Sequence, residues 1–90
     1  MEKVKLHTDI MTVGDGAFKN CTALKDITCE PSTAPTLGTD VFGGKAEHYV
    51  GSDVTGDKYL RILTNATGYT TGDWKTILQD KVGFIITEIS

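Results

Sequence analysis

The chain has 90 residues, of which 39% are hydrophobic and 23% are charged, a composition typical of a globular domain rather than a disordered segment. A net charge of −3 without a cluster of Lys and Arg argues against binding to a nucleic-acid backbone. No apolar stretch reaches the roughly 18 residues needed to cross a bilayer, and the first residues lack the apolar core of a secretory signal. These properties predict one small domain without membrane insertion.

The sequence repeats itself with a period of 23 to 24 residues. The segment 14–18 (GDGAF) recurs as 38–42 (GTDVF), and the alternating triplet 4–6 (VKL) recurs as 27–29 (ITC). Periods of about 20 to 29 residues are typical of leucine-rich repeats, in which each unit supplies one short strand and one return segment. We therefore predict that triplets 4–6 and 27–29 lie side by side as strands.

Within the first repeat, apolar residues are mostly three positions apart and then alternate, at Val13, Ala17, Phe18, Cys21, Leu24, Ile27 and Cys29. This spacing predicts a tight helical or 3₁₀ return segment followed by a strand with one buried face. Phe18 and Phe42 are then expected to fill equivalent slots in successive coils, one ring on the other. The segment 30–36 contains two prolines and predicts an extended, solvated loop.

The second repeat is followed by an insertion. The next apolar-polar-apolar triplet is 60–62, which begins 33 residues after Ile27, so about nine residues have been added to the period. Turn-forming residues at 51–57 separate two flanks that favour β-structure. We therefore predict a hairpin with arms near 47–50 and 58–63.

The last part of the chain predicts a helix followed by a strand. From residue 69 the apolar positions follow a helical period, and the pattern from Thr70 to Asp73 predicts the start of the helix at Thr70. Gly83 predicts its end, where a left-handed residue is needed. Segment 84–89 predicts one further strand, and helix and strand together are expected to cap the exposed end of the repeats.

Residues 13–27, with the pattern V-G-x-x-A-F-x-x-C-x-x-L-x-x-I, closely resemble the BspA-like leucine-rich repeat of bacterial surface proteins. Segments 29–37 and 66–74 resemble the last repeat and the C-terminal end of such proteins, so the resemblance covers residues 10–42 and about 60–84. It implies a secreted or surface-displayed array that binds host proteins or neighbouring cells without catalysis. It supplies a class of function but no ligand and no catalytic residues.

The predicted fold class is therefore α+β and rich in β-structure. We expect a short leucine-rich-repeat solenoid fragment of about two repeats, with an inserted hairpin and a C-terminal helix and strand cap. Residues 1–90 form a single domain, divided into repeats at 4–42, an insert at 43–59, and the last repeat strand with the cap at 60–90. Because the first triplet begins so near the start of the chain, we interpret the sequence as part of a longer array.

Cys21 and Cys29 are open to three interpretations: a disulfide, a buried pair of small apolar side chains, or half of a metal site. Burial is favoured because both positions fall on the apolar pattern of the repeat. The only imidazoles that could activate a thiol are His7 and His48, and neither cysteine stands in a catalytic signature. The sequence therefore predicts no enzyme, no cofactor and no metal site.

The candidate ligand contacts are His48, Tyr49 and Tyr59, which lie in the insert and on its flank. The two tyrosines are expected either to pack across the hairpin or to face a sugar ring or a protein partner. Tyr69 and Trp74 are assigned to the core of the cap. The predicted function is non-catalytic protein binding at a bacterial surface or in a secreted protein. A carbohydrate-binding module and a purely structural cap of a longer array are the alternatives.

Overall fold

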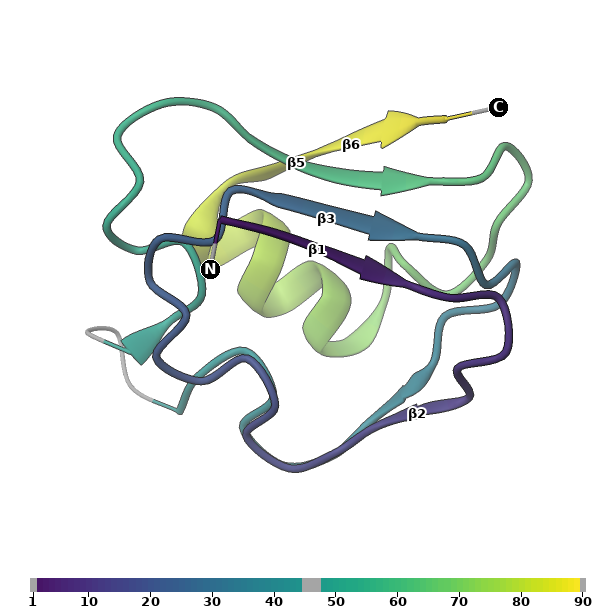
Figure 1. Ribbon diagram of the computed structural model, residues 1–90, viewed down its shortest axis with the longest axis horizontal. Helices are drawn as coiled ribbons and strands as arrows, with labels where there is room; N and C mark the ends of the chain where they lie inside the picture. Colours follow the sequence, from purple (N-terminus) through teal and green to yellow (C-terminus); the bar gives the residue numbers. More distant parts are fainter. Residues whose placement is uncertain (1, 45–47, 90) are drawn as a thin grey trace.

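The computed structural model describes residues 2–44 and 48–89 (Figure 1). In chain order its elements are β1 (Lys3–Leu6), β2 (Thr12–Val13), β3 (Asp26–Cys29), β4 (Thr36–Leu37), β5 (Lys58–Ile62), the π-helix η2 (Trp74–Val82) and β6 (Phe84–Glu88). The longer strands form an all-parallel sheet in the order β1-β3-β5-β6, and β2 pairs in parallel with β4. The strands of the larger sheet therefore lie side by side in the order in which they occur along the chain.

The register of the larger sheet follows the repeated triplets. Val4 is aligned with Ile27, and Ile27 is aligned with Leu60. This confirms that segments 4–6 and 27–29 lie side by side, and it confirms the alignment of 60–62 with the earlier triplets. Because side chains alternate along a strand, the aligned apolar residues all face one side of the sheet, where they form the core.

The repeated turns also lie one on the other. Gly16 N donates to Thr39 O at 2.9 Å, and Phe18 N donates to Val41 O at 2.9 Å. The rings of Phe18 and Phe42 are stacked, with centroids 6.1 Å apart and an interplanar angle of 7°. The predicted stacking of these two phenylalanines is confirmed.

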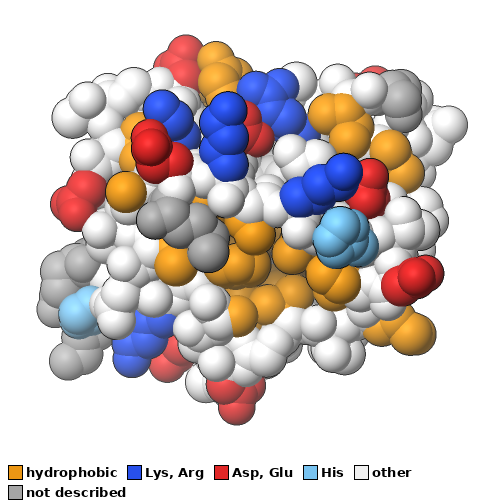
Figure 2. Space-filling model, in the orientation of Figure 1, with side chains coloured by type: hydrophobic (Ala, Val, Ile, Leu, Met, Phe, Trp, Pro, Cys, Tyr) orange, Lys and Arg blue, Asp and Glu red, His pale blue; other side chains and the backbone are white. Residues whose placement is uncertain are grey.

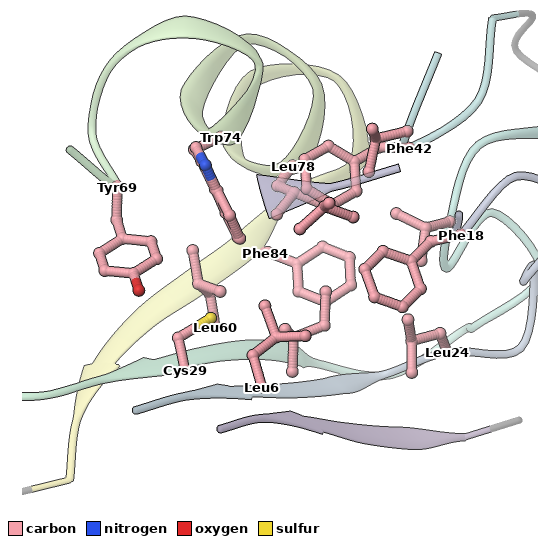
Figure 3. Packing of buried hydrophobic residues seen from close by; sticks show 14 of the residues in the cluster. Leu6, Phe18, Leu24, Cys29, Phe42, Leu60, Tyr69, Trp74, Leu78 and Phe84 are labelled. Carbon is pink, nitrogen blue, oxygen red and sulfur yellow. The ribbon is translucent and has the colours of Figure 1, made fainter. Parts of the chain in front are cut away.

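The core lies between the sheet and the helix. Figure 3 shows Leu60, Cys29 and Leu6 rising from the strands toward the aromatic rings and Leu78 of the helix. Leu60, Cys29 and Leu78 are fully buried, and all of these residues belong to one cluster. A single core therefore joins the repeated segments to the C-terminal helix.

The end of η2 was predicted correctly, but its start was not. Gly83 ends the helix with φ 89° and donates its N–H to Leu78 O. The residue at the N-terminal cap is Asp73, without a side-chain capping hydrogen bond, so the prediction of a cap at Thr70 is wrong. The neighbouring Thr71 hydroxyl instead donates to Gly68 O at 3.3 Å, which stabilises the turn before the helix.

The predicted fold class is wrong. The described residues form a small α/β-type domain with a four-stranded parallel sheet, a two-stranded sheet and one helix, and they show no solenoid. The dimensions, 32 × 26 × 21 Å, are those of a compact unit. The physical reason is that the helix packs on the same core as both repeated segments, so the molecule closes instead of extending.

The predicted hairpin is also wrong. Residues 48–50 form turn structure, while residue 47 lies outside the described part of the chain. The other expected arm is β5, which pairs in parallel with β3 on one side and with β6 on the other. Because both edges of β5 are occupied, no edge remains for an antiparallel partner.

Candidate functional site

The outer face of the sheet is the best candidate site, because the described helix and the β2–β4 pair lie on the opposite side (Figure 1). The parallel register places the outward side chains in two rows that run across the strands. The first row contains Lys3, Asp26, Tyr59 and Ile85, and the second contains Lys5, Thr28, Arg61 and Thr87. Four strands thus present one continuous surface of mixed charged, aromatic and apolar character.

Arg61 is fixed in the middle of this face. Its Nε atom lies 3.0 Å from both carboxylate oxygens of Asp26, and its guanidinium lies 5.0 Å from the centre of the Tyr59 ring. The Tyr59 hydroxyl donates to Asp57 at 3.3 Å. The ion pair and the cation–π contact restrict the side chains of Arg61 and Tyr59 before any partner arrives.

Positive charge dominates the β1 side of the same face. Lys3 and Lys5 flank an open hollow of about 370 Å³ that Asp26, Thr28 and Arg61 also line. Lys5 lies 3.5 Å from Glu30, whereas Lys3 has no ion-pair partner within residues 2–44 and 48–89. Figure 2 shows Lys and Arg side chains gathered over the strands in the upper part of the view. This basic region belongs to a chain whose net charge is −3.

Tyr49 and Tyr59, both predicted as ligand contacts, do not form a cross-strand pair. Tyr59 lies on the outer face of β5, but Tyr49 lies beside the end of η2, where Lys81 Nζ is 5.5 Å from its ring centre and 3.2 Å from its hydroxyl. Tyr49 lines a pocket of about 510 Å³ together with Ser52, Lys58, Lys81 and Val82. The two tyrosines therefore belong to two separate surfaces.

His48, the third predicted contact, lies near the turn of the first repeat. Its Nδ1 atom contacts the side-chain oxygen of Asn20, and its carbonyl accepts the Asn20 N–H at 3.0 Å. Asn20 has φ 68°, a left-handed conformation that Asn tolerates better than most residues. These contacts give His48 a structural role at the turn and separate it from the Tyr59 surface.

Both cysteines are free thiols. Cys29 is fully buried, as predicted, whereas Cys21 is only half-buried. Burial raises the pKa of the Cys29 thiol to about 12, which keeps it protonated near neutral pH. His7 Nδ1 lies 3.8 Å from a Glu30 carboxylate oxygen, on the surface. This arrangement gives Cys29 the character of a core residue rather than that of a nucleophile.

Sequence reasoning missed Asp26, Arg61 and Lys81 as members of these surfaces. The signal for Arg61 was present, because it is the polar middle residue of the triplet 60–62 and must point away from the core side. Within the described residues no group of three or more His, Cys, Asp and Glu side chains could hold a metal ion. No helix in this part of the chain has the length and apolarity needed to span a membrane.

No protein-family model matches this chain, and neither the curated proteins nor the solved structures contain a match. The resemblance of residues 13–27 to the BspA-like repeat therefore stays a prediction. The two surfaces that could bind a partner are the outer sheet face and the pocket beside Tyr49.

Proposed function

We propose that the protein is a non-catalytic protein-binding module whose contact surface is the outer face of the sheet. In line with the family resemblance, its setting is a bacterial surface or a secreted protein, and its partner is a host protein or a protein on another cell. The observation that carries the proposal is the fixed position of Arg61 between Asp26 and the Tyr59 ring.

Arg and Tyr are the side chains that most often dominate binding energy in protein interfaces. Arg61 is held in one orientation, so binding a partner costs less side-chain entropy than ordering a free arginine would. Lys3 and Lys5 extend the surface with positive charge. An extended face with a rigid aromatic and cationic centre suits a protein surface better than a small molecule.

The test is a binding screen of the wild-type protein against immobilised extracellular-matrix and cell-surface proteins. Tyr59→Ala and Arg61→Ala should each weaken a saturable interaction by about tenfold or more, as expected for residues at an interface centre. The matched control is Tyr49→Ala, which removes a tyrosine from a different surface. Equal losses in Tyr49→Ala and Tyr59→Ala, or no saturable binding in any screen, would refute the assignment of the sheet face.

A carbohydrate-binding module is the second candidate, and the pocket beside Tyr49 favours it. An aromatic ring, the Ser52 hydroxyl and the Lys58 ammonium group line one cavity of about 510 Å³, which is large enough for a sugar ring. A glycan array separates the candidates, because sugar binding that is lost in Tyr49→Ala and kept in Tyr59→Ala supports this second function. Binding by neither surface would leave only a structural role.

A further inference from the structure

The parallel sheet ends in two edges of opposite character. At one edge, β1 carries Lys3 and Lys5 on its outer face. At the other edge, β6 carries Ile85, which is 46% exposed, and Ile89, just past its end, is 39% exposed. Within residues 2–44 and 48–89 no segment pairs with the open side of either strand. Natural proteins commonly protect open edges with charged residues, and only the β1 edge has lysines of this kind.

The hydrogen bonds of β6 identify the backbone groups that face outward. Ile89 N donates to Ile62 O at 2.8 Å, so residue 89 and the odd-numbered residues of β6 turn their backbone toward β5. Backbone groups alternate between the two sides of a strand, so those of Phe84, Ile86 and Glu88 point to the open side. This side is a row of donors and acceptors without a strand partner in the described residues.

The geometry points to a second copy of this chain as the partner of that row. In this arrangement the two β6 strands run antiparallel about a two-fold axis at Ile86. Phe84 then lies opposite Glu88 of the second copy, and every outward N–H and C=O of these residues finds a partner. The two sheets continue into one another across the interface.

The side chains of β6 fit this two-fold arrangement. Ile85 lies opposite Thr87 of the second copy and diagonally across from its own symmetry mate, a separation of roughly 7–8 Å between equivalent atoms. The exposed apolar surface of Ile85 is then covered on both copies. The single charged residue of the strand, Glu88, lies toward its end, so the two copies of Glu88 stay apart.

The β1 edge excludes the equivalent contact. Glu30 N donates to Leu6 O at 3.0 Å, so Leu6 turns its backbone toward β3, and the outward groups of β1 belong to Lys3 and Lys5. Antiparallel pairing of two β1 strands would place these lysines opposite one another, which is destabilising. Self-association is thereby directed to β6.

Sedimentation velocity from micromolar to millimolar concentration tests the proposal, and we expect a monomer that converts to a dimer. Ile85→Lys should weaken the dimer by about 100-fold or more, because the introduced ammonium groups approach one another across the axis. The matched control is Met11→Lys, which removes an 80% exposed apolar side chain from a loop distant in the chain and should leave dimerisation unchanged. Amide hydrogen exchange on the wild type adds a measurement that needs no variant.

In that exchange experiment the amides of Phe84, Ile86 and Glu88 should become more protected as concentration rises, while those of Lys3 and Lys5 should not. A protein that stays monomeric at millimolar concentration would overturn the inference. So would protection at Lys3 and Lys5, assembly beyond a dimer, or equal weakening by Met11→Lys and Ile85→Lys.

Discussion

The two halves of the molecule join their neighbours by different means. In residues 3–42 the same turn is built twice, and the copies are linked by backbone hydrogen bonds such as Phe18 N to Val41 O at 2.9 Å. In residues 58–89 the connection between β5 and β6 contains the helix η2, whose backbone groups mostly bond within the helix. Backbone hydrogen bonds such as Thr67 N to Ser32 O at 2.9 Å still join this half to the first, and side chains add a second kind of link.

Two aromatic residues with polar tips provide this side-chain link. The Tyr69 hydroxyl donates to Pro31 O at 2.8 Å, and Trp74 Nε1 donates to Pro35 O at 3.3 Å. Their rings meet edge to face, with centroids 4.9 Å apart. The comparison shows that the repeated half is joined turn to turn by backbone groups, whereas the region around the helix also uses amphipathic side chains that reach carbonyls of segment 31–35.

The largest expected effect comes from removing the ring that joins the two halves. Phe42 stacks on Phe18 and meets Trp74 edge to face at 5.2 Å. Phe42→Ala should lower the free energy of unfolding by about 3–5 kcal/mol, a large share of the stability of so small a domain. Urea unfolding followed by Trp74 fluorescence measures it. Phe18→Ala, which removes a ring with one described aromatic contact, should cost less, and an equal or larger loss would break the comparison.

A second effect spans the halves because Cys29 and Tyr69 are both buried and influence each other's ionisation. Burial raises the pKa of Cys29 from 9.0 to about 12. Burial, together with the nearby Cys29 charge and hydrogen bond, also raises the pKa of Tyr69. Both groups are neutral when protonated, so above about pH 9 the unfolded chain binds fewer protons than the folded one and stability falls with pH.

We expect this alkaline loss to reach up to about 1.4 kcal/mol per pH unit for Cys29 above about pH 9, and Tyr69 should add to the loss only above about pH 10. Urea unfolding between about pH 8 and pH 10 measures it. Cys29→Val retains a small apolar side chain but does not ionise, so its stability should decline less steeply over this range. Parallel pH profiles for the variant and the wild type would contradict the assignment.

The smallest predicted effect compares one glycine from each half. Gly83 has φ 89°, and a Cβ atom built on it meets no atom within 4 Å, so Gly83→Ala adds backbone strain alone. The cost should be about 1 kcal/mol in thermal unfolding. Gly14 is equally open but has no left-handed φ, so Gly14→Ala should change stability by about 0.5 kcal/mol or less. Similar losses of stability at both positions would mean that backbone strain does not determine the cost of Gly83→Ala.

Sequence spacing was a good guide to neighbours within the repeated half. The period placed 4–6 beside 27–29 and stacked Phe18 on Phe42, because a repeated backbone needs the same side-chain size at the same position. The end of the helix was also predicted correctly, because Gly83 is a glycine and adopts the left-handed conformation needed there more readily than other residues.

The errors arose where distant parts of the chain decide the outcome. Segment 58–63 has the composition of a hairpin arm, but β6 takes the edge of β5 that an arm would need. Pro31 and Pro35 look like solvated loop residues, yet both are buried beneath Tyr69 and Trp74, which lie more than 35 residues further along the chain. Local sequence patterns do not reveal contacts between distant segments, and the fold class depends on those contacts.

The candidate site was predicted only in part for the same reason. Tyr59 was selected because it is an aromatic residue on a predicted strand, and it lies on the outer face of the sheet. Its neighbour Arg61 is fixed by Asp26, a residue 35 positions away that only the strand register brings close. The expected pairing of Tyr49 with Tyr59 depended on the hairpin and was wrong with it.

The shared direction of the four strands has a mechanical consequence. β1 begins at one end of the sheet and β6 finishes at the other, on the opposite edge (Figure 1). A tensile load applied between these two points would act along the strands and shear them past one another. The hydrogen bonds between neighbouring strands would then have to rupture together rather than one after another. A domain with this arrangement of strands resists pulling more strongly than one whose hydrogen bonds can break one at a time.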